Sequence, residues 1–410
     1  MPGLLLSFLR DADWFDARRA RAYRLLLALG GLFAAAGLIA FSHAGIDPTG
    51  KPLGTDFLAF WSAARLALAG TPEAAWNIAR IGAYERAAMP VDPGVSSFLY
   101  PPAFLILCMP FGLLPYFAAL PLWLMLTGGA YLMAIRLWLV RHKGALITVA
   151  AFPAVLTNIG HGQNGFLTAA LLGGGLALLD RRPWIGGALL GALIIKPHMA
   201  LALPVLLIAG AHWRSILSAL ISATALCAAS LLMFGTRSWT AFVNGASLGR
   251  AILDQGLVPP EKMVSIFAAM RVLHEPVALA YAAQLSVALG AGALLAWVAR
   301  RRSTAPGGTA ALAAAATLLM SPFLLDYDLT ALAIPLAWLF SEGLRRGFAT
   351  WEKILLGAGY VLPLLSRTLA FSTGVPVAPF ILSALMLAVA RAALFEGQPR
   401  LAEARTPSAA

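Results

Sequence analysis

Long apolar runs recur along the whole chain, and this feature constrains the fold more than any other. A run of about 20 apolar residues is long enough to cross the hydrocarbon core of a bilayer as a helix. The composition agrees, because 60% of the residues are hydrophobic and 12% are charged, whereas about a quarter of a soluble globular protein is charged. A soluble enzyme, a disordered chain and a coiled coil are therefore excluded. We predict an all-α polytopic membrane protein.

The net charge of +12 does not indicate a nucleic-acid partner. Basic residues lie in short clusters between the apolar runs, which is the pattern that orients loops in a membrane. The first apolar run, residues 25–41, follows a long and partly acidic segment, so we expect an uncleaved helix with a cytoplasmic N-terminus. The clusters that we place in the cytoplasm are Arg141–Lys143, Arg181–Arg182, Arg214, Arg300–Arg302 and Arg345–Arg346.

Between these clusters, the apolar runs predict pairs of helices whose tips face outside. Many of these helices have only about 12–15 residues, which is too short for a full crossing. Short helices that end in polar residues indicate broken helices whose tips line a wet cavity at membrane depth. Residues 103–114 are read as a half-crossing. We expect roughly 10–13 membrane segments in one domain, 1–395, and a cytoplasmic tail, 396–410. The paired runs are 145–159 with 163–179, 184–195 with 199–211, and 309–325 with 329–341.

Two longer polar segments are placed outside, at residues 44–100 and 235–276. In the first, apolar and aromatic residues recur at helical spacing after Asp56, which predicts an amphipathic helix at the membrane interface with Trp61 at headgroup level. Asp56 stands at the start of this helix, where an aspartate can cap backbone N–H groups. The second segment contains no specific motif and is expected to cover the outside entrance of a cavity.

Four sets of polar residues lie at the predicted outside tips. Polar groups in membrane segments are costly, so each set is a functional hypothesis. Structural roles stay open: Gln163 and Asn164 can cap a following helix, Lys196 can extend to the surface, and His198 can be a buried neutral histidine. Convergence of all four sets on one face favours a site. The sets are Asp56; His161, Gln163 and Asn164; Lys196 and His198; and Asp326 and Asp328.

The chemistry of these residues suits transfer of a group from a lipid phosphate to an alcohol. Lys196 and His198 can neutralise a phosphate, and a carboxylate such as Asp56 can take a proton from a hydroxyl. Nucleotide hydrolysis and zinc chemistry lack their motifs, GxxxxGK[ST] and HExxH. The two cysteines, Cys108 and Cys227, lie inside apolar runs and are read as core residues.

Five short motifs follow one another along the chain: Thr55–Arg65, Tyr100-Pro101-Pro102, Gly162-Gln163-Asn164-Gly165, Lys196-Pro197-His198, and Ser321-Pro322 followed by Asp326-Tyr327-Asp328. Together they resemble the motifs of glycosyltransferase family 87. The motifs span about residues 54–335, and their order and spacing are more specific than any one of them. Soon after the Ser-Pro motif, where some members carry histidines, this chain has Tyr327 and Asp328.

The resemblance implies a GT-C-like fold in the bacterial inner membrane with a periplasmic active site. It implies an inverting hexosyltransferase that takes a sugar, first of all mannose, from a polyprenyl-phosphate donor to a glycolipid or glycan acceptor, with Asp56 as general base. No cofactor is expected, although Asp326 and Asp328 are of the type that binds a divalent cation. The further expected roles are donor-phosphate binding for Lys196, His198, Arg65 and Arg250, and substrate binding for Trp61, His161, Gln163, Asn164, Asp326, Tyr327 and Asp328.

Two other functions use similar features. A flippase or transporter of lipid-linked sugars also has broken helices and buried polar residues. An O-antigen ligase or polymerase takes a similar donor but transfers a whole glycan. A long outside loop with an aspartate directly before an aromatic helix favours the glycosyltransferase.

Overall fold

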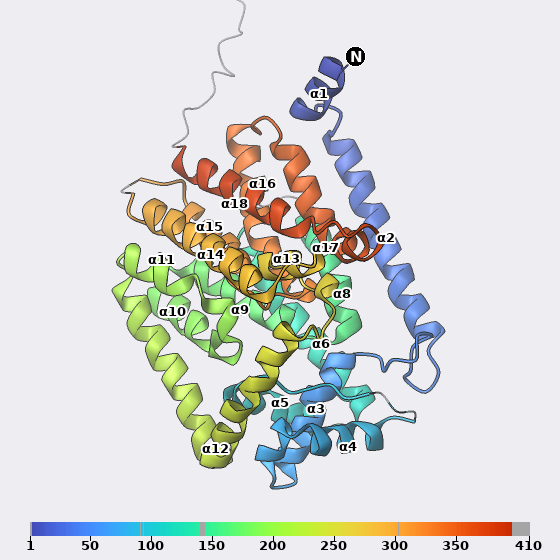
Figure 1. Ribbon diagram of the computed structural model, residues 1–410. Helices are drawn as coiled ribbons and strands as arrows, with labels where there is room; N and C mark the ends of the chain where they lie inside the picture. The colour runs from blue at the N-terminus through green and yellow to red at the C-terminus, as the bar shows by residue number, and fades with distance from the viewer. Residues whose placement is uncertain (1, 91, 93, 140–143, 302, 396–410) are drawn as a thin grey trace, which may run out of the picture.

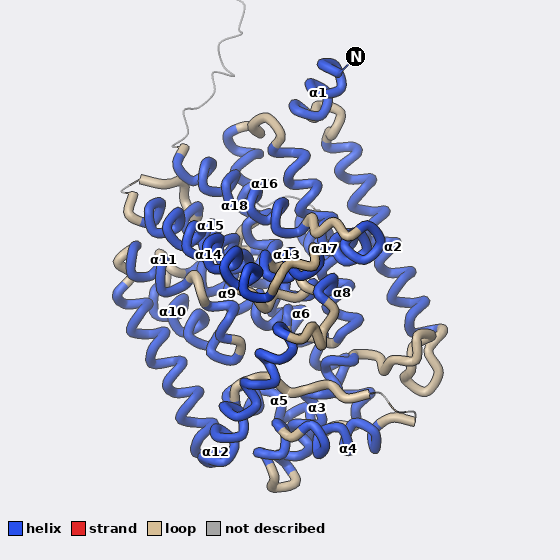
Figure 2. Tube along the Cα trace, viewed as in Figure 1, coloured by secondary structure: helices blue, strands red, loops and turns tan. Residues whose placement is uncertain are grey.

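The computed structural model describes residues 2–90, 92, 94–139, 144–301 and 303–395 (Figures 1 and 2). These residues form helices joined by loops, with no β-strand among them. The prediction of an all-α polytopic membrane protein is confirmed, because five helices are long and apolar enough to cross a bilayer. They are α2 (Ala17–Ala40), α6 (Tyr116–Arg136), α12 (Trp213–Asp254), α14 (Val277–Ala299) and α17 (Glu352–Thr373).

A second group of apolar helices is shorter than a membrane crossing. At 1.5 Å per residue, the 14 residues of α9 extend about 21 Å, whereas the hydrocarbon core is about 30 Å thick. The predicted short helices are therefore present, including one at residues 103–114, the segment that we had read as a half-crossing. This group comprises α5 (Pro102–Gly112), α9 (Gly165–Leu178), α10 (Pro183–Gly191), α11 (Leu203–Ala209), α15 (Gly308–Met320) and α18 (Ala378–Leu394).

The predicted polar tips fall between these short helices. Proline at the first helical position, which needs no N–H partner, starts α8 (Pro153–His161) directly after α7 (Ala145–Ala150). Residues 162–164 then link α8 to α9. At the other two tips, the chain passes through 3₁₀ turns, where helices in a membrane are commonly interrupted. These are η2 (Ala192–Ile195) and η3 (Pro197–Ala200) before α11, and η5 (Asp326–Leu332) before α16 (Ala333–Arg346).

The first predicted outside segment folds into a compact unit at the end of the molecule opposite the N-terminus (Figure 1). It contains α3 (Thr55–Leu68), η1 (Pro72–Trp76) and α4 (Ile78–Ala88). Most apolar side chains of α3, which we had predicted to lie at the membrane interface, are buried in a protein core. Phe60 packs edge-on against Phe104 of α5, with ring centroids 4.9 Å apart, and Phe57 lies 5.9 Å from Trp123 of α6. Apolar residues on several faces of α3 make this burial favourable.

The second predicted outside segment is mostly helical. Helix α12 continues past residue 235, where Gly235 has φ 72° and ψ 173°. Only glycine adopts this backbone conformation readily, and the chain bends there, so that the two parts of α12 form a V in Figure 1. The second part leads back toward η4 (Pro260–Lys262) and α13 (Ile266–Val272). Residues 235–276, which we had placed outside, therefore include the second part of α12, η4 and α13.

The remaining predictions about the ends of the chain are only partly within the described residues. Helix α1 (Pro2–Asp11) precedes α2, and Arg10 O accepts a hydrogen bond from Trp351 N at the start of α17. The predicted cytoplasmic cluster Arg141–Lys143, residue 302 and the tail 396–410 lie outside the described residues.

Candidate active site

Two glycines bring the beginning of α3 to the end of α8. Gly54 (φ 71°) precedes α3 and Gly162 (φ 64°) follows α8, both in the left-handed region that glycine favours. Their backbones are so close that a Cβ on Gly162 would lie 3.1 Å from Cα of Gly54. Tyr116 Oη donates a hydrogen bond to Gly54 O at 3.0 Å, and Trp123 Nε1 donates one to Gly162 O at 3.1 Å. Helix α6 therefore holds both segments.

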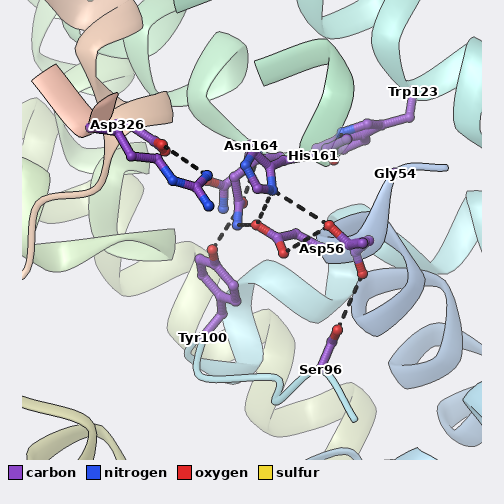
Figure 3. Close-up of polar contacts among 12 residues, drawn as sticks. Gly54, Asp56, Ser96, Tyr100, Trp123, His161, Asn164 and Asp326 are labelled. Carbon is purple, nitrogen blue, oxygen red and sulfur yellow. Dashed lines mark hydrogen bonds and ion pairs between the residues drawn. The ribbon is translucent and has the colours of Figure 1, made fainter. Parts of the chain in front are cut away.

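This close approach places Asp56 beside the tip that follows α8. Gln163 Nε2 donates a hydrogen bond to Asp56 Oδ2 at 3.0 Å, and His161 Nδ1 lies 3.7 Å from the same oxygen. The Asp56 side chain remains 28% exposed. The N-cap residue of α3 is Gly54, and no side chain caps the helix. The alternative that Asp56 is a helix cap is therefore wrong, because its carboxylate faces His161 and Gln163 instead (Figure 3).

Gln163 is itself held in a fixed orientation. Its Oε1 accepts hydrogen bonds from Tyr100 Oη at 3.0 Å and from Asn164 N at 2.7 Å, so that its Nε2 points to Asp56. Figure 3 shows Tyr100 directed into the same cluster. Neither Gln163 nor Asn164 caps α9 with its side chain. Tyr100 was absent from our predicted site, although the Tyr100-Pro101-Pro102 motif had marked it.

Lys196 lies deeper, in a buried ion pair with Asp328. Its Nζ is 2.5 Å from Asp328 Oδ1 and donates a further hydrogen bond to Asn164 Oδ1 at 3.1 Å. The two charged side chains are 3% and 0% exposed, so Lys196 does not extend to the surface. Asp328 Oδ2 also accepts a hydrogen bond from Leu325 N at 3.2 Å. We had expected the ammonium group of Lys196 to bind a phosphate. Asp328 already neutralises it, because the segment that carries Lys196 packs against η5.

The remaining residues of these tips surround this pair. Tyr327 lies with its ring 5.0 Å from Lys196 Nζ and 5.7 Å from the His161 ring. His198 packs against Phe323, with ring centroids 5.9 Å apart, and no described residue accepts from or donates to its buried Nε2. Asp326 is nearly buried, and Arg367 Nη1 lies 3.9 Å from its Oδ2.

Three residues that we had predicted for the site do not join this cluster. Trp61 and Arg65 are five and nine residues beyond Asp56, which turns them about 140° and 180° around α3 from it. Trp61 Nε1 donates to Leu114 O at 2.9 Å, and Arg65 Nη1 donates to Gly112 O at 3.3 Å. Arg250 is exposed on α12 and pairs with Asp254 at 3.2 Å. We had expected Trp61 to pack against a sugar and Arg65 and Arg250 to bind phosphate. None of these contacts involves Asp56 or the residues that bind it.

Sequence reasoning missed two cations near Asp326. Arg367 is an isolated arginine within the apolar helix α17, and such a residue is itself a signal of function. Lys262 ends η4, outside the membrane-spanning helices. Burial lowers the pKa of Lys262, the charges of Arg367 and Lys51 lower it further, and Asp56 and Asp326 oppose this shift. No motif marks Lys262 in the sequence.

The start of α3 has a further buried support. Ser96 Oγ donates a hydrogen bond to Thr55 O at 3.3 Å, and Ser96 N donates one to Glu85 Oε2 at 3.0 Å. Glu85 is 1% exposed, and burial raises its pKa to about 7. The shift arises because ionised carboxylates are costly to bury. Through Ser96, this titratable group is connected by hydrogen bonds to the segment that carries Asp56.

Comparison with protein families identifies the chain. The sequence model of glycosyltransferase family 87 matches residues 98–322, more than half of the 410 residues. The chain belongs to glycosyltransferase family 87. The resemblance drawn from the sequence motifs is thereby confirmed, and this family 87 member is a membrane glycosyltransferase. Its match includes Gln163, Asn164 and Lys196, whereas Asp56, Asp328 and Arg367 lie outside the matched range.

Comparisons with curated proteins and with solved structures gave no match. The described residues of this family 87 glycosyltransferase contain no group of three or more histidine, cysteine, aspartate or glutamate side chains that could hold a metal ion. Asp326 and Asp328, which we had considered as cation ligands, face Arg367 and Lys196 respectively.

Proposed function

We propose that this glycosyltransferase transfers a hexose, first of all mannose, from a polyprenyl-phosphate sugar to a hydroxyl group of an envelope glycolipid or glycan. We place the reaction at the periplasmic face of the bacterial inner membrane, with both termini in the cytoplasm. The observation that carries the proposal is Asp56: a partly exposed carboxylate, oriented by Gln163 and lying beside His161 at a junction of broken membrane helices.

In the proposed step, the acceptor oxygen attacks the anomeric carbon of the donor sugar. The bond between that carbon and the phosphate oxygen breaks, and its electron pair leaves with the lipid phosphate. Asp56 takes the proton of the acceptor hydroxyl, as a general base must lie within hydrogen-bond reach of the proton that it removes. A single displacement inverts the anomeric centre, so a β-linked donor yields an α-linked product.

The neighbouring residues have distinct parts in this proposal. His161 lies beside Asp56 in Figure 3 and is 27% exposed, so it is suited to bind a substrate hydroxyl. Gln163 orients the base. Asn164, Tyr327 and Asp328 surround Lys196. They contribute to substrate binding by fixing the shape of the segments between the broken helices. We assign no metal to the step, because the carboxylates of η5 already face cations of the protein.

The test is transfer by the purified protein in detergent or liposomes. A radiolabelled polyprenyl-phosphate mannose is supplied with an envelope lipid extract as acceptor, and Asp56→Asn is the matched control. A labelled glycolipid formed by the wild type and not by Asp56→Asn supports the proposal. Movement of the donor across the bilayer without any covalent product would identify a flippase, and transfer of a preassembled glycan alone would identify a ligase.

A further inference from the structure

Two cations near Asp326 are not part of the Lys196–Asp328 pair. Arg367 is 45% exposed, and its Nη1 reaches only to 3.9 Å from Asp326 Oδ2. Among the described residues, Asp326 is the only acidic side chain with which Arg367 forms an ion pair. A guanidinium has five N–H donors, so one distant carboxylate oxygen satisfies only a small part of its hydrogen-bonding capacity.

Backbone contacts join the segment that follows Lys262 to the segment that precedes Asp326. Val264 N donates a hydrogen bond to Leu324 O at 2.9 Å, and Met263 forms an antiparallel bridge with Leu325. These contacts fix the segment after Lys262 against the segment before Asp326. Helix α17, which carries Arg367, packs against both η4 and η5. Two cations from separate parts of the chain therefore lie near Asp326.

One cation near Asp326 has no ion-pair partner among the described residues. Lys196 is neutralised by Asp328, and Asp326 faces Arg367. No described acidic side chain forms an ion pair with Lys262. Burial lowers its pKa, the positive charges of Arg367 and Lys51 lower it further, and Asp56 and Asp326 oppose this shift. Like charges held together repel one another, so the arrangement is favourable for a bound anion. The buried ammonium group of Lys196 is already paired with Asp328.

We propose that Arg367 and Lys262 bind the phosphate of the lipid-linked sugar donor. The inference rests on the proposed function and names a subsite within it. When the bond to the anomeric carbon breaks, the phosphodiester becomes a phosphate monoester and its negative charge increases. Fixed cations beside the departing oxygen stabilise this charge in the transition state. Arg367, which lies outside the residues matched by the family, and Lys262 take the role that we had expected of Lys196.

The subsite is tested by binding of a short-chain polyprenyl phosphate, compared with the uncharged polyprenol of the same length. Hydrogen bonds to charged groups contribute enough for about a 10- to 100-fold change in affinity. We expect Arg367→Gln and Lys262→Gln each to raise the Kd for polyprenyl phosphate by about that factor and to leave the Kd for polyprenol unchanged. Arg367→Lys should retain part of the affinity, because it retains the charge.

Matched controls separate this result from misfolding and from failure of the proposed function. Arg237→Gln removes an exposed arginine of α12 and should alter neither Kd. If Arg367→Gln does not fold, Lys262→Gln alone decides. Wild-type affinity for polyprenyl phosphate in Lys262→Gln and in a folded Arg367→Gln would overturn the subsite while wild-type sugar transfer persists. Absence of any sugar transfer by the wild type would instead overturn the proposed function.

Discussion

Gln163 donates a hydrogen bond from Nε2 to Oδ2 of Asp56 over 3.0 Å, and this bond connects residues 107 positions apart in the chain. The same amide accepts hydrogen bonds from Tyr100 and from Asn164 N, which fixes its orientation. Asp56 therefore has a defined direction although it is partly exposed. In the proposed reaction, this orientation prepares the carboxylate to receive a proton.

Asp56→Asn should abolish most of the activity without unfolding the protein. Asparagine retains an oxygen that can accept from Gln163, but it cannot take the acceptor's proton. We expect turnover to fall by about 10²–10⁴-fold, the usual contribution of a general base, with an unchanged Kd for the donor. The measurement is single-turnover transfer. Asp92→Asn, an exposed carboxylate in the same segment, is the control, and near-normal turnover of Asp56→Asn would contradict the assignment.

The Lys196–Asp328 pair should be essential to stability as a pair. Removing one partner leaves an uncompensated buried charge, which costs about 3–5 kcal/mol. We expect Lys196→Met and Asp328→Asn each to lower the free energy of unfolding by about that amount. The loss in the double variant should be smaller than the sum of the two single losses. Thermal unfolding of all four proteins in detergent measures this cycle. Strictly additive losses would show that the pair is not energetically coupled.

Gly162→Ala should disturb the contact between α3 and α8. A Cβ there would lie 2.7 Å from Cβ of Phe57, and the left-handed backbone adds about 1–2 kcal/mol for a residue with a side chain. We expect a lower unfolding temperature and lower transfer activity. Gly160→Ala is the matched control, because a Cβ at Gly160 meets no atom within 4 Å. Equal stability of the two variants would refute this explanation.

Glu85 should make the stability depend on pH. Burial raises its pKa to about 7 from the usual 4.5, so between these pH values the folded protein keeps a proton that the unfolded chain releases. The contribution of Glu85 to stability therefore falls as pH rises through this window and is constant above it. Glu85→Gln should remove this slope and be the more stable protein above pH 7. Unfolding temperatures from pH 5 to 8 test this, and an unchanged slope would exclude Glu85 as its source.

The proposed orientation places the 44–100 segment in the periplasm and the end of α14 in the cytoplasm. Single cysteines at Thr49 and Arg301, both exposed, can be introduced into a protein that lacks Cys108 and Cys227. An impermeant thiol reagent, applied to cells with a permeabilised outer membrane, should label the cysteine at position 49 only. Labelling at position 301 alone would reverse the orientation and remove the periplasmic active site from the proposal.

The sequence alone determined the membrane class, the helical fold and the positions of the short helices. These properties depend on hydropathy summed over neighbouring residues, and polar residues such as Lys196 and Asp326 stand out against an apolar background. The motifs also determined the family. The aromatic spacing of α3 did not show that its apolar side chains pack in a protein core, because such residues have similar spacing in a helix at a membrane interface and in a helix within a core.

Only the tertiary structure decided which polar residues meet. Lys196 pairs with Asp328 across 132 residues of chain, and Arg367 approaches Asp326 from a helix that no motif marked. Arg65 and Arg250 are of a residue type that binds phosphate, but they lie apart from Asp56. Charge and residue type are local properties, whereas the partner that neutralises a charge depends on how distant helices pack. For this reason the sequence indicated a cationic site but could not show which cations are still available to bind an anion.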